Sequence, residues 1–229
     1  MLTNIKRLLL LCTFLITFNS FANDFLDAAA AYERGDYTTA LTLSKKLAEQ
    51  GYASAQFLLG SMYRNGKGTP QNYKAAIKWY TKAAEQGEAD AQFHLGAMYK
   101  NGQVIPQDYK AAIKWYTKSA EQGEVKAQYN LGRMYQNGHG TPQDYKEAIK
   151  WWTKAAEQGE VHAQFNLGVA YARGAGTPQD YVMAHMLWNI AAANGDEGAK
   201  SNRNEVEGMM TPNQIEQARQ LAKEWMKKY

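Results

Sequence analysis

The chain has 229 residues, 26 lysines and arginines against 22 acidic residues, a formal charge of +4 and a single cysteine, Cys12. Without residues 1–22, which carry Lys6, Arg7 and Cys12, there remain 24 basic and 22 acidic residues and no cysteine. Because residues 23–229 contain no cysteine, a disulfide framework and a thiol nucleophile are excluded there. The nearly neutral remainder also gives no compositional case for binding nucleic acid.

Residues 1–22 have the pattern of a secretory signal peptide. Lys6 and Arg7 precede an apolar run over residues 8–18, and Ser20 and Ala22 form a small-x-small cleavage site. A membrane anchor is the alternative, but the run is well short of the roughly 20 residues that span a bilayer. Cys12 lacks the preceding small residue of a lipoprotein attachment site. We therefore expect a periplasmic or secreted protein, cleaved after Ala22, with no membrane span in the mature chain.

Residues 23–52 contain the pattern of a helical hairpin that is shorter than those that follow. Arg34, Gly35 and Asp36 connect its two halves without a longer insertion, and Tyr37 lies 36 residues before Tyr73. Because the segment is in phase with the rest of the chain, we interpret it as an N-terminal capping hairpin.

One 36-residue sequence then occurs four times, over residues 53–88, 89–124, 125–160 and 161–196. In the third copy the apolar positions over residues 127–137 recur every three or four residues, which predicts a first helix. Gly138 and Gly140 indicate a turn, and Pro142 is well placed at the start of a second helix over 143–158 with Thr141 as its N-cap. Each copy is thus predicted to form a helical hairpin that buries its apolar face only by stacking on its neighbours.

Residues 197–229 are predicted to form a C-terminal capping hairpin. Thr211 and Gln214 have the spacing of a capping box, and an amphipathic helix follows. Three positions of the second helix are lysine in the first three copies but apolar in the fourth, where a lid is therefore required. The lysines are Lys74, Lys78, Lys82, Lys110, Lys114, Lys118, Lys146, Lys150 and Lys154, and the apolar residues are Val182, Met186 and Ile190.

The motifs AQxxLGxMY, NGxGTPQDY and AAIKWYTKAAEQG, repeated in register, resemble the Sel-one-like repeat (SLR) family, a relative of the tetratricopeptide repeat (TPR). The resemblance implies an all-α fold of the TPR/SLR type, a right-handed α-α superhelix (solenoid) of stacked helical hairpins. In TPR-type superhelices the first helices line the concave groove.

Positions that are identical in every copy are expected to serve packing. A mid-helix glycine costs about 1 kcal/mol relative to alanine, so its repetition indicates a close approach by another helix. These structural repeat positions include Gly60, Gly96, Gly132, Gly168, Tyr63, Tyr99, Tyr135 and Tyr171.

Positions that change between copies occupy three registers on one face of the first helix and form our candidate partner-binding surface. The alternative is that they vary because nothing constrains them. The candidate residues are Asp90, His94, Lys126, Asn130, Arg133, His162 and Asn166.

The sequence shows no pattern of a catalytic, cofactor or metal site. No two of the four histidines have metal-ligand spacing within a helix, and no serine is followed by lysine at the third position, as S-x-x-K enzymes require. The lysines on the second helices could attract an anionic envelope polymer, although solvation alone also explains them. We expect a non-catalytic scaffold that binds a partner protein or peptide in envelope assembly or host interaction. The alternative, by family resemblance, is a β-lactamase or a protein that binds penicillin or cell-wall fragments.

Overall fold

The computed structural model describes residues 23–102 and 104–229, which form helices joined by turns, with no strand in these ranges. The predicted signal peptide lies outside the described residues. Across the part of the chain that is described, no helix combines the length and the apolar character needed to cross a membrane.

The chain divides into two compact units, Met1–Leu95 and Gly96–Tyr229, and the division falls within one helix. Residues 23–33 form the first described helix. The following helices are α2 (Tyr37–Glu49), α3 (Ala53–Asn65), α4 (Tyr73–Glu85), α5 (Ala89–Asn101), α6 (Tyr109–Glu121), α7 (Val125–Asn137), α8 (Tyr145–Glu157), α9 (Val161–Arg173), α10 (Tyr181–Ala193), α11 (Glu197–Glu207) and α12 (Pro212–Lys228).

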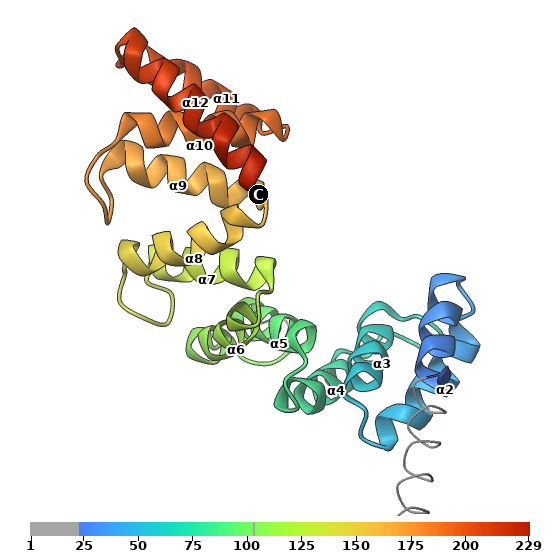
Figure 1. The fold of residues 1–229 in the computed structure, drawn as a ribbon. Helices are drawn as coiled ribbons and strands as arrows, with labels where there is room; N and C mark the ends of the chain where they lie inside the picture. The colour runs from blue at the N-terminus through green and yellow to red at the C-terminus, as the bar shows by residue number, and fades with distance from the viewer. Residues whose placement is uncertain (1–22, 103) are drawn as a thin grey trace, which may run out of the picture. The chain divides into compact units, whose positions relative to one another are not determined.

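Within each unit, helices that follow one another in the sequence pack against one another. In the first unit α3 packs on α2 and α4, and in the second the hairpins α7–α8 and α9–α10 meet through α8 and α9. Figure 1 shows this succession in the second unit, with α11 and α12 next to α10. The prediction of an all-helical solenoid of stacked hairpins is confirmed.

The second helix of the repeat begins later than predicted. Asp144, and not Thr141, is the N-cap of α8, and its carboxylate accepts hydrogen bonds from the backbone N–H groups of Lys146 and Glu147. The backbone N–H of Asp144 donates to the carbonyl of Tyr135 at 2.9 Å, which holds the cap residue against α7. Thr141 and Pro142 therefore lie in the connection before the helix, because the aspartate is the acceptor placed directly at the helix end.

The mid-helix glycines lie against aromatic side chains of the second helix. A Cβ atom on Gly60 would be 2.8 Å from Cδ1 of Tyr80, and one on Gly132 would be 2.5 Å from Cδ1 of Trp152. Both rings are almost completely buried, and burial raises the pKa of Tyr80 to about 12. The glycine thus allows the two helices of a hairpin to approach closely enough to enclose a large ring.

A buried glutamine joins each hairpin to the one before it. The Nε2 group donates to the carbonyl of an alanine eight residues earlier, near the end of the preceding second helix, at distances of 3.0 to 3.2 Å. The pairs are Gln56 with Ala48, Gln92 with Ala84, Gln128 with Ala120, and Gln164 with Ala156. Each of these carbonyls also accepts from the backbone N–H of the glycine three residues later, so the glutamine adds a second hydrogen bond at the helix end.

The last hairpin covers the apolar outer face of α10. Met186 and Ile190 are 3% and 2% exposed and belong to one apolar cluster with Ala222 of α12, against which Leu221 and Trp225 pack. The predicted capping box at the start of α12 is present. The expected lid is therefore α12.

Candidate functional site

The candidate partner-binding residues on the first helices differ in exposure. The half-buried members are His94, Asn130 and Asn166. The exposed members are Asp90, Lys126, Arg133 and His162.

His94 is a packing residue of the first unit. Its ring stacks on Tyr80 with centroids 5.4 Å apart and on Phe57 at 5.8 Å. A guanidinium nitrogen of Arg64 lies 2.8 Å from Nδ1 of His94. Because these contacts join α3 to α5, His94 offers a partner less free surface than its polar side chain suggested.

Asn130 has a comparable position between α5 and α7. Its Oδ1 accepts from Nζ of Lys100 at 3.1 Å, and its amide donates to the carbonyl of Lys126 at 2.8 Å. Burial, and secondarily the positive charge of Arg133, lower the pKa of Lys100. Lys100 and Asn130 thus form a partly buried polar contact between successive first helices.

Arg133 and His162 come together around one aromatic ring. The guanidinium of Arg133 lies 6.0 Å from the ring centroid of Tyr129, and the His162 ring is 5.8 Å from the same ring. His162 Nδ1 is also 2.9 Å from Oε1 of Glu160, and its side chain is 71% exposed. The structure therefore places two of the predicted residues together on an accessible surface formed by α7 and α9.

A second set of equivalent positions on the first helices lies opposite the half-buried positions of His94 and Asn130 in the next copy. From the first copy to the fourth, the residues at this position are Arg64, Lys100, Gln136 and Ala172. Arg64 and Lys100 fill the space between helices by reaching the next copy. Between Gln136 and Asn166 a cavity of about 30 Å³ remains. Ala172 is too short to reach the next helix, and a larger space opens there.

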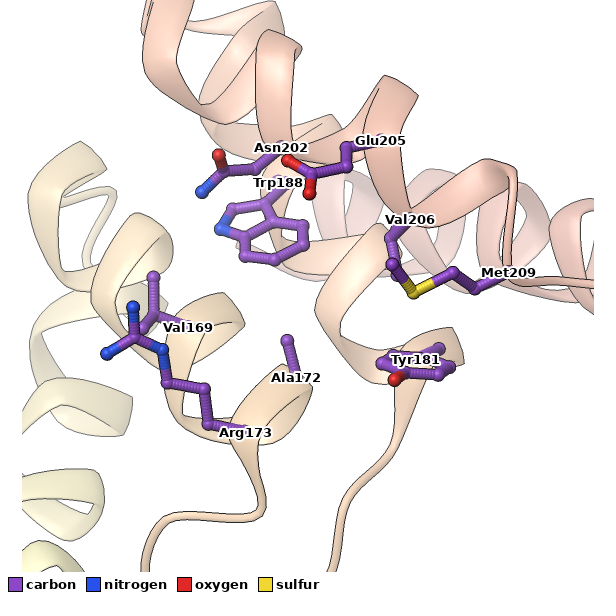
Figure 2. A pocket seen from close by; sticks show the side chains of 9 residues that line it. All are labelled: Val169, Ala172, Arg173, Tyr181, Trp188, Asn202, Glu205, Val206 and Met209. Atoms are coloured by element: carbon purple, nitrogen blue, oxygen red, sulfur yellow. The ribbon is translucent and has the colours of Figure 1, made fainter.

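This larger space is a pocket of about 240 Å³ between α9, α10 and α11. Figure 2 shows Trp188 facing it from α10, Arg173 on one side and Met209 on the other. The α11 side is formed by Asn202, which is in phase with Asn130 and Asn166, and by Glu205. We refer to it as the α9–α11 pocket, and to the 30 Å³ space as the α7–α9 cavity.

Trp188 forms a rigid floor of the α9–α11 pocket. Its indole Nε1–H donates to the carbonyl of Phe165 at 3.1 Å, and only 5% of its surface is exposed. A Cβ on Gly168 would overlap the indole, so glycine at this position allows Trp188 to lie against α9. The repeated glycine and aromatic positions of the hairpin thus place an aromatic side chain at the base of the pocket.

None of the residues that line the α9–α11 pocket is among the seven candidate residues of the sequence. Asn166 lines the neighbouring α7–α9 cavity, whereas Arg173, Asn202 and Glu205 of the pocket were not recognised. The available signal was the 36-residue spacing, which continues from Asn166 to Asn202 and places Ala172 where longer side chains stand in the earlier copies.

The lysines on the second helices are exposed, and six of them flank tryptophans. Lys78 and Lys82 lie 5.7 and 4.8 Å from the ring centroid of Trp79. The same arrangement recurs around Trp115 and Trp151. Part of the role of these lysines is therefore to cover aromatic surface through their alkyl stems and charges.

Among residues 23–102 and 104–229, no group of three or more histidines, cysteines, aspartates and glutamates is placed to hold a metal ion. The features that the geometry does bring together are a polar first-helix face and a small pocket with an aromatic floor.

Comparison with family models matches the Sel1 repeat to residues 53–88, 89–124, 125–160 and 161–196, the four copies seen in the sequence. No curated protein shows significant similarity to the chain.

Solved structures give the same result. A Sel1 repeat protein from Oxalobacter formigenes is 34% identical with a TM-score of 0.78, over 90% of this chain and 85% of that one. The protein c5321, a protective antigen of uropathogenic Escherichia coli strains with an SLR fold, is 33% identical with a TM-score of 0.56 over 91% of this chain. The match covers 54% of c5321, so the chain spans about half of that protein's length.

Proposed function

From the premise that the chain belongs to the Sel1 repeat family, we propose that it is a non-catalytic scaffold that binds a partner protein or peptide through its first helices. The observation that carries the proposal is the contrast between the two faces of the hairpins in the second unit. Two second helices, α6 and α8, repeat the same three lysines and one tryptophan position, whereas the first helices expose a different polar set in each copy.

Several features of the first-helix face support binding to a polypeptide. Lys126, Arg133 and His162 are exposed, and the last two share the ring of Tyr129. These side chains are carried by helices that are ordered by buried contacts, so binding requires little further ordering of the scaffold. Affinity can then accumulate from several small contacts along successive repeats.

The proposed place of action is the bacterial periplasm or the medium, in envelope assembly or in contact with a host. The signal-peptide pattern of residues 1–22 supports this proposal.

Affinity capture from envelope extract with matched variants tests the scaffold function. The test variant carries Lys126→Ala, Arg133→Ala and His162→Ala. We expect it to lose the captured partner while its circular dichroism melt stays within a few degrees of the parent. The control carries Lys146→Ala, Lys150→Ala and Lys154→Ala, removes the same number of exposed cationic or polar side chains from α8, and should retain the partner. Equal capture by both variants would overturn the assignment of the binding face.

A second experiment tests the non-catalytic part of the proposal. Purified protein incubated with a chromogenic β-lactam should give the same rate as buffer, because no serine in the chain has the S-x-x-K spacing. Turnover above the buffer rate that purifies with the protein would contradict it.

A further inference from the structure

The α9–α11 pocket has the size of a site for one side chain. At about 240 Å³ it is smaller than the roughly 300–1,000 Å³ of pockets that enclose drug-sized ligands. The α7–α9 cavity, at about 30 Å³, has room for little more than water. Of these two equivalent spaces, only the one beside Ala172 can accept a large side chain.

Its apolar surface favours an aromatic side chain. The floor is the indole of Trp188, and Val206 and Tyr181 form part of the wall. Met209 is 59% exposed at the edge of the pocket, in the turn between α11 and α12. An aromatic ring can contact the small exposed part of the Trp188 indole, and a thioether adapts its shape to a ring edge.

Two opposite charges border this apolar surface. Arg173 comes from α9 and Glu205 from α11, and both side chains are exposed. Within the described residues, neither the Arg173 guanidinium nor the Glu205 carboxylate makes a hydrogen bond or an ion pair. A ligand that places an acidic group by Arg173 and a basic group by Glu205 would therefore gain two charge contacts without breaking existing ones.

We propose that the α9–α11 pocket holds an aromatic anchor residue of a partner peptide, with an acidic residue on one side of the anchor and a basic residue on the other. The proposal rests on the scaffold function and specifies what the scaffold recognises. Buried aromatic anchors contribute a large share of binding energy at protein interfaces, and surrounding polar contacts determine their orientation.

A random 12-residue peptide library displayed on phage and selected against the full-length chain provides the probe. Selected phage are then depleted on the Ala172→Gln variant, in which the side chain that stands in the third copy fills the pocket. We expect the remaining peptides to share an aromatic residue with charges of opposite sign on its two sides. A selection without such a motif, or one that yields no peptide, would overturn the proposal.

Affinity measurements with the strongest selected peptide locate the contact. Ala172→Gln should weaken binding at least tenfold, and Glu205→Lys should change the preference from a basic to an acidic residue at that flank. Gln136→Ala is the matched control, because it alters the α7–α9 cavity and leaves the α9–α11 pocket unchanged. Circular dichroism melts of all three variants establish that they are folded. Equal affinity for the parent and Ala172→Gln would refute the pocket assignment.

The two proposals can fail separately. If the triple variant on Lys126, Arg133 and His162 loses the captured partner while Ala172→Gln retains it, the scaffold function stands and the pocket inference is wrong. If neither variant affects capture, the first-helix face is not the binding surface.

Discussion

The third and fourth copies of the repeat, α7–α8 and α9–α10, share one backbone plan but differ on both faces. On the first-helix side, Gln136 in the third copy is replaced by Ala172 in the fourth, and the space beside it grows from about 30 to about 240 Å³. On the outer side, Lys150 and Lys154 are exposed, whereas Met186 and Ile190 are buried under α12. The repeated residues build the hairpin, and the changed residues give the last copy a pocket and a lid.

Replacing the buried tryptophan of either copy should give the largest loss of stability, and the loss should be equal in the two copies. Trp152 and Trp188 each donate an indole hydrogen bond to the carbonyl of the residue 23 positions earlier. Replacing either with alanine should lower the free energy of unfolding by about 3–5 kcal/mol, because each change leaves a cavity beside a glycine. Urea unfolding monitored by circular dichroism measures this loss. A loss below about 1 kcal/mol for Trp188→Ala alone would show that the two tryptophans are not equivalent.

The two copies also differ in whether α12 covers the outer face of the second helix. Ile190→Lys places a charge beneath α12 without a partner and should cost about 3 kcal/mol. Its counterpart, Lys154→Ile, alters an exposed position and should change the free energy of unfolding by less than about 0.5 kcal/mol. Thermal melts of the two variants compare them directly. Similar melting temperatures would contradict the assignment of α12 as the cover of α10.

The buried glutamines of the two copies differ in the hydrogen bonds that they make where one hairpin contacts the next. Gln128 donates to Ala120 and also accepts from Nε2 of Gln158, whereas Gln164 donates to Ala156 and its Oε1 has no hydrogen-bond partner among the described residues. We expect Gln128→Ala to cost about 2 kcal/mol and Gln164→Ala about 1 kcal/mol. Urea unfolding of both variants would reveal the difference, and the reverse order would argue against this network.

The contact between His185 of α10 and Glu207 of α11 should make the stability of the chain depend on pH. His185 Nε2 lies 2.8 Å from Oε1 of Glu207, and this hydrogen bond, helped by Arg219, lowers the pKa of Glu207. A lowered carboxyl pKa contributes stability above the unfolded-state pKa, about 4.5, and the contribution disappears as the pH falls through the folded-state value.

Glu207→Gln should therefore cost about 1 kcal/mol at pH 7 and progressively less below about pH 4.5. Melts between pH 3 and pH 7 measure this trend. A deficit that is constant over the whole range would exclude a contribution from the charged carboxylate.

The hairpins, the capping box and the need for a lid could be predicted from the sequence because the spacing of residues along the chain indicates each of them. The 36-residue period revealed the units, and the change from Lys150 to Met186 revealed the uncovered face. The N-cap was predicted wrongly at Thr141 because the connection also contains Asp144, and only the hydrogen bond to Tyr135 shows which residue meets the helix end.

The α9–α11 pocket was not predictable in the same way. It results from the short side chain of Ala172 and from α11 residues in a segment whose sequence diverges from the repeat. His94 is a case of the opposite kind. Its polar side chain suggested a binding residue, but in the structure its ring packs on Phe57 and Tyr80. Spacing identifies faces of helices, but the filling of the space between them depends on pairs of side chains from different copies.

The proposed partner peptide occupies the pocket beside the fourth copy and not the equivalent space beside the third. NMR of the indole N–H groups, assigned by single tryptophan substitutions, tests it while the selected peptide is titrated into the full-length chain. We expect the Trp188 signal to shift with peptide concentration and the Trp152 signal to stay unchanged. An unchanged Trp188 signal at saturation, or equal shifts of both signals, would contradict it.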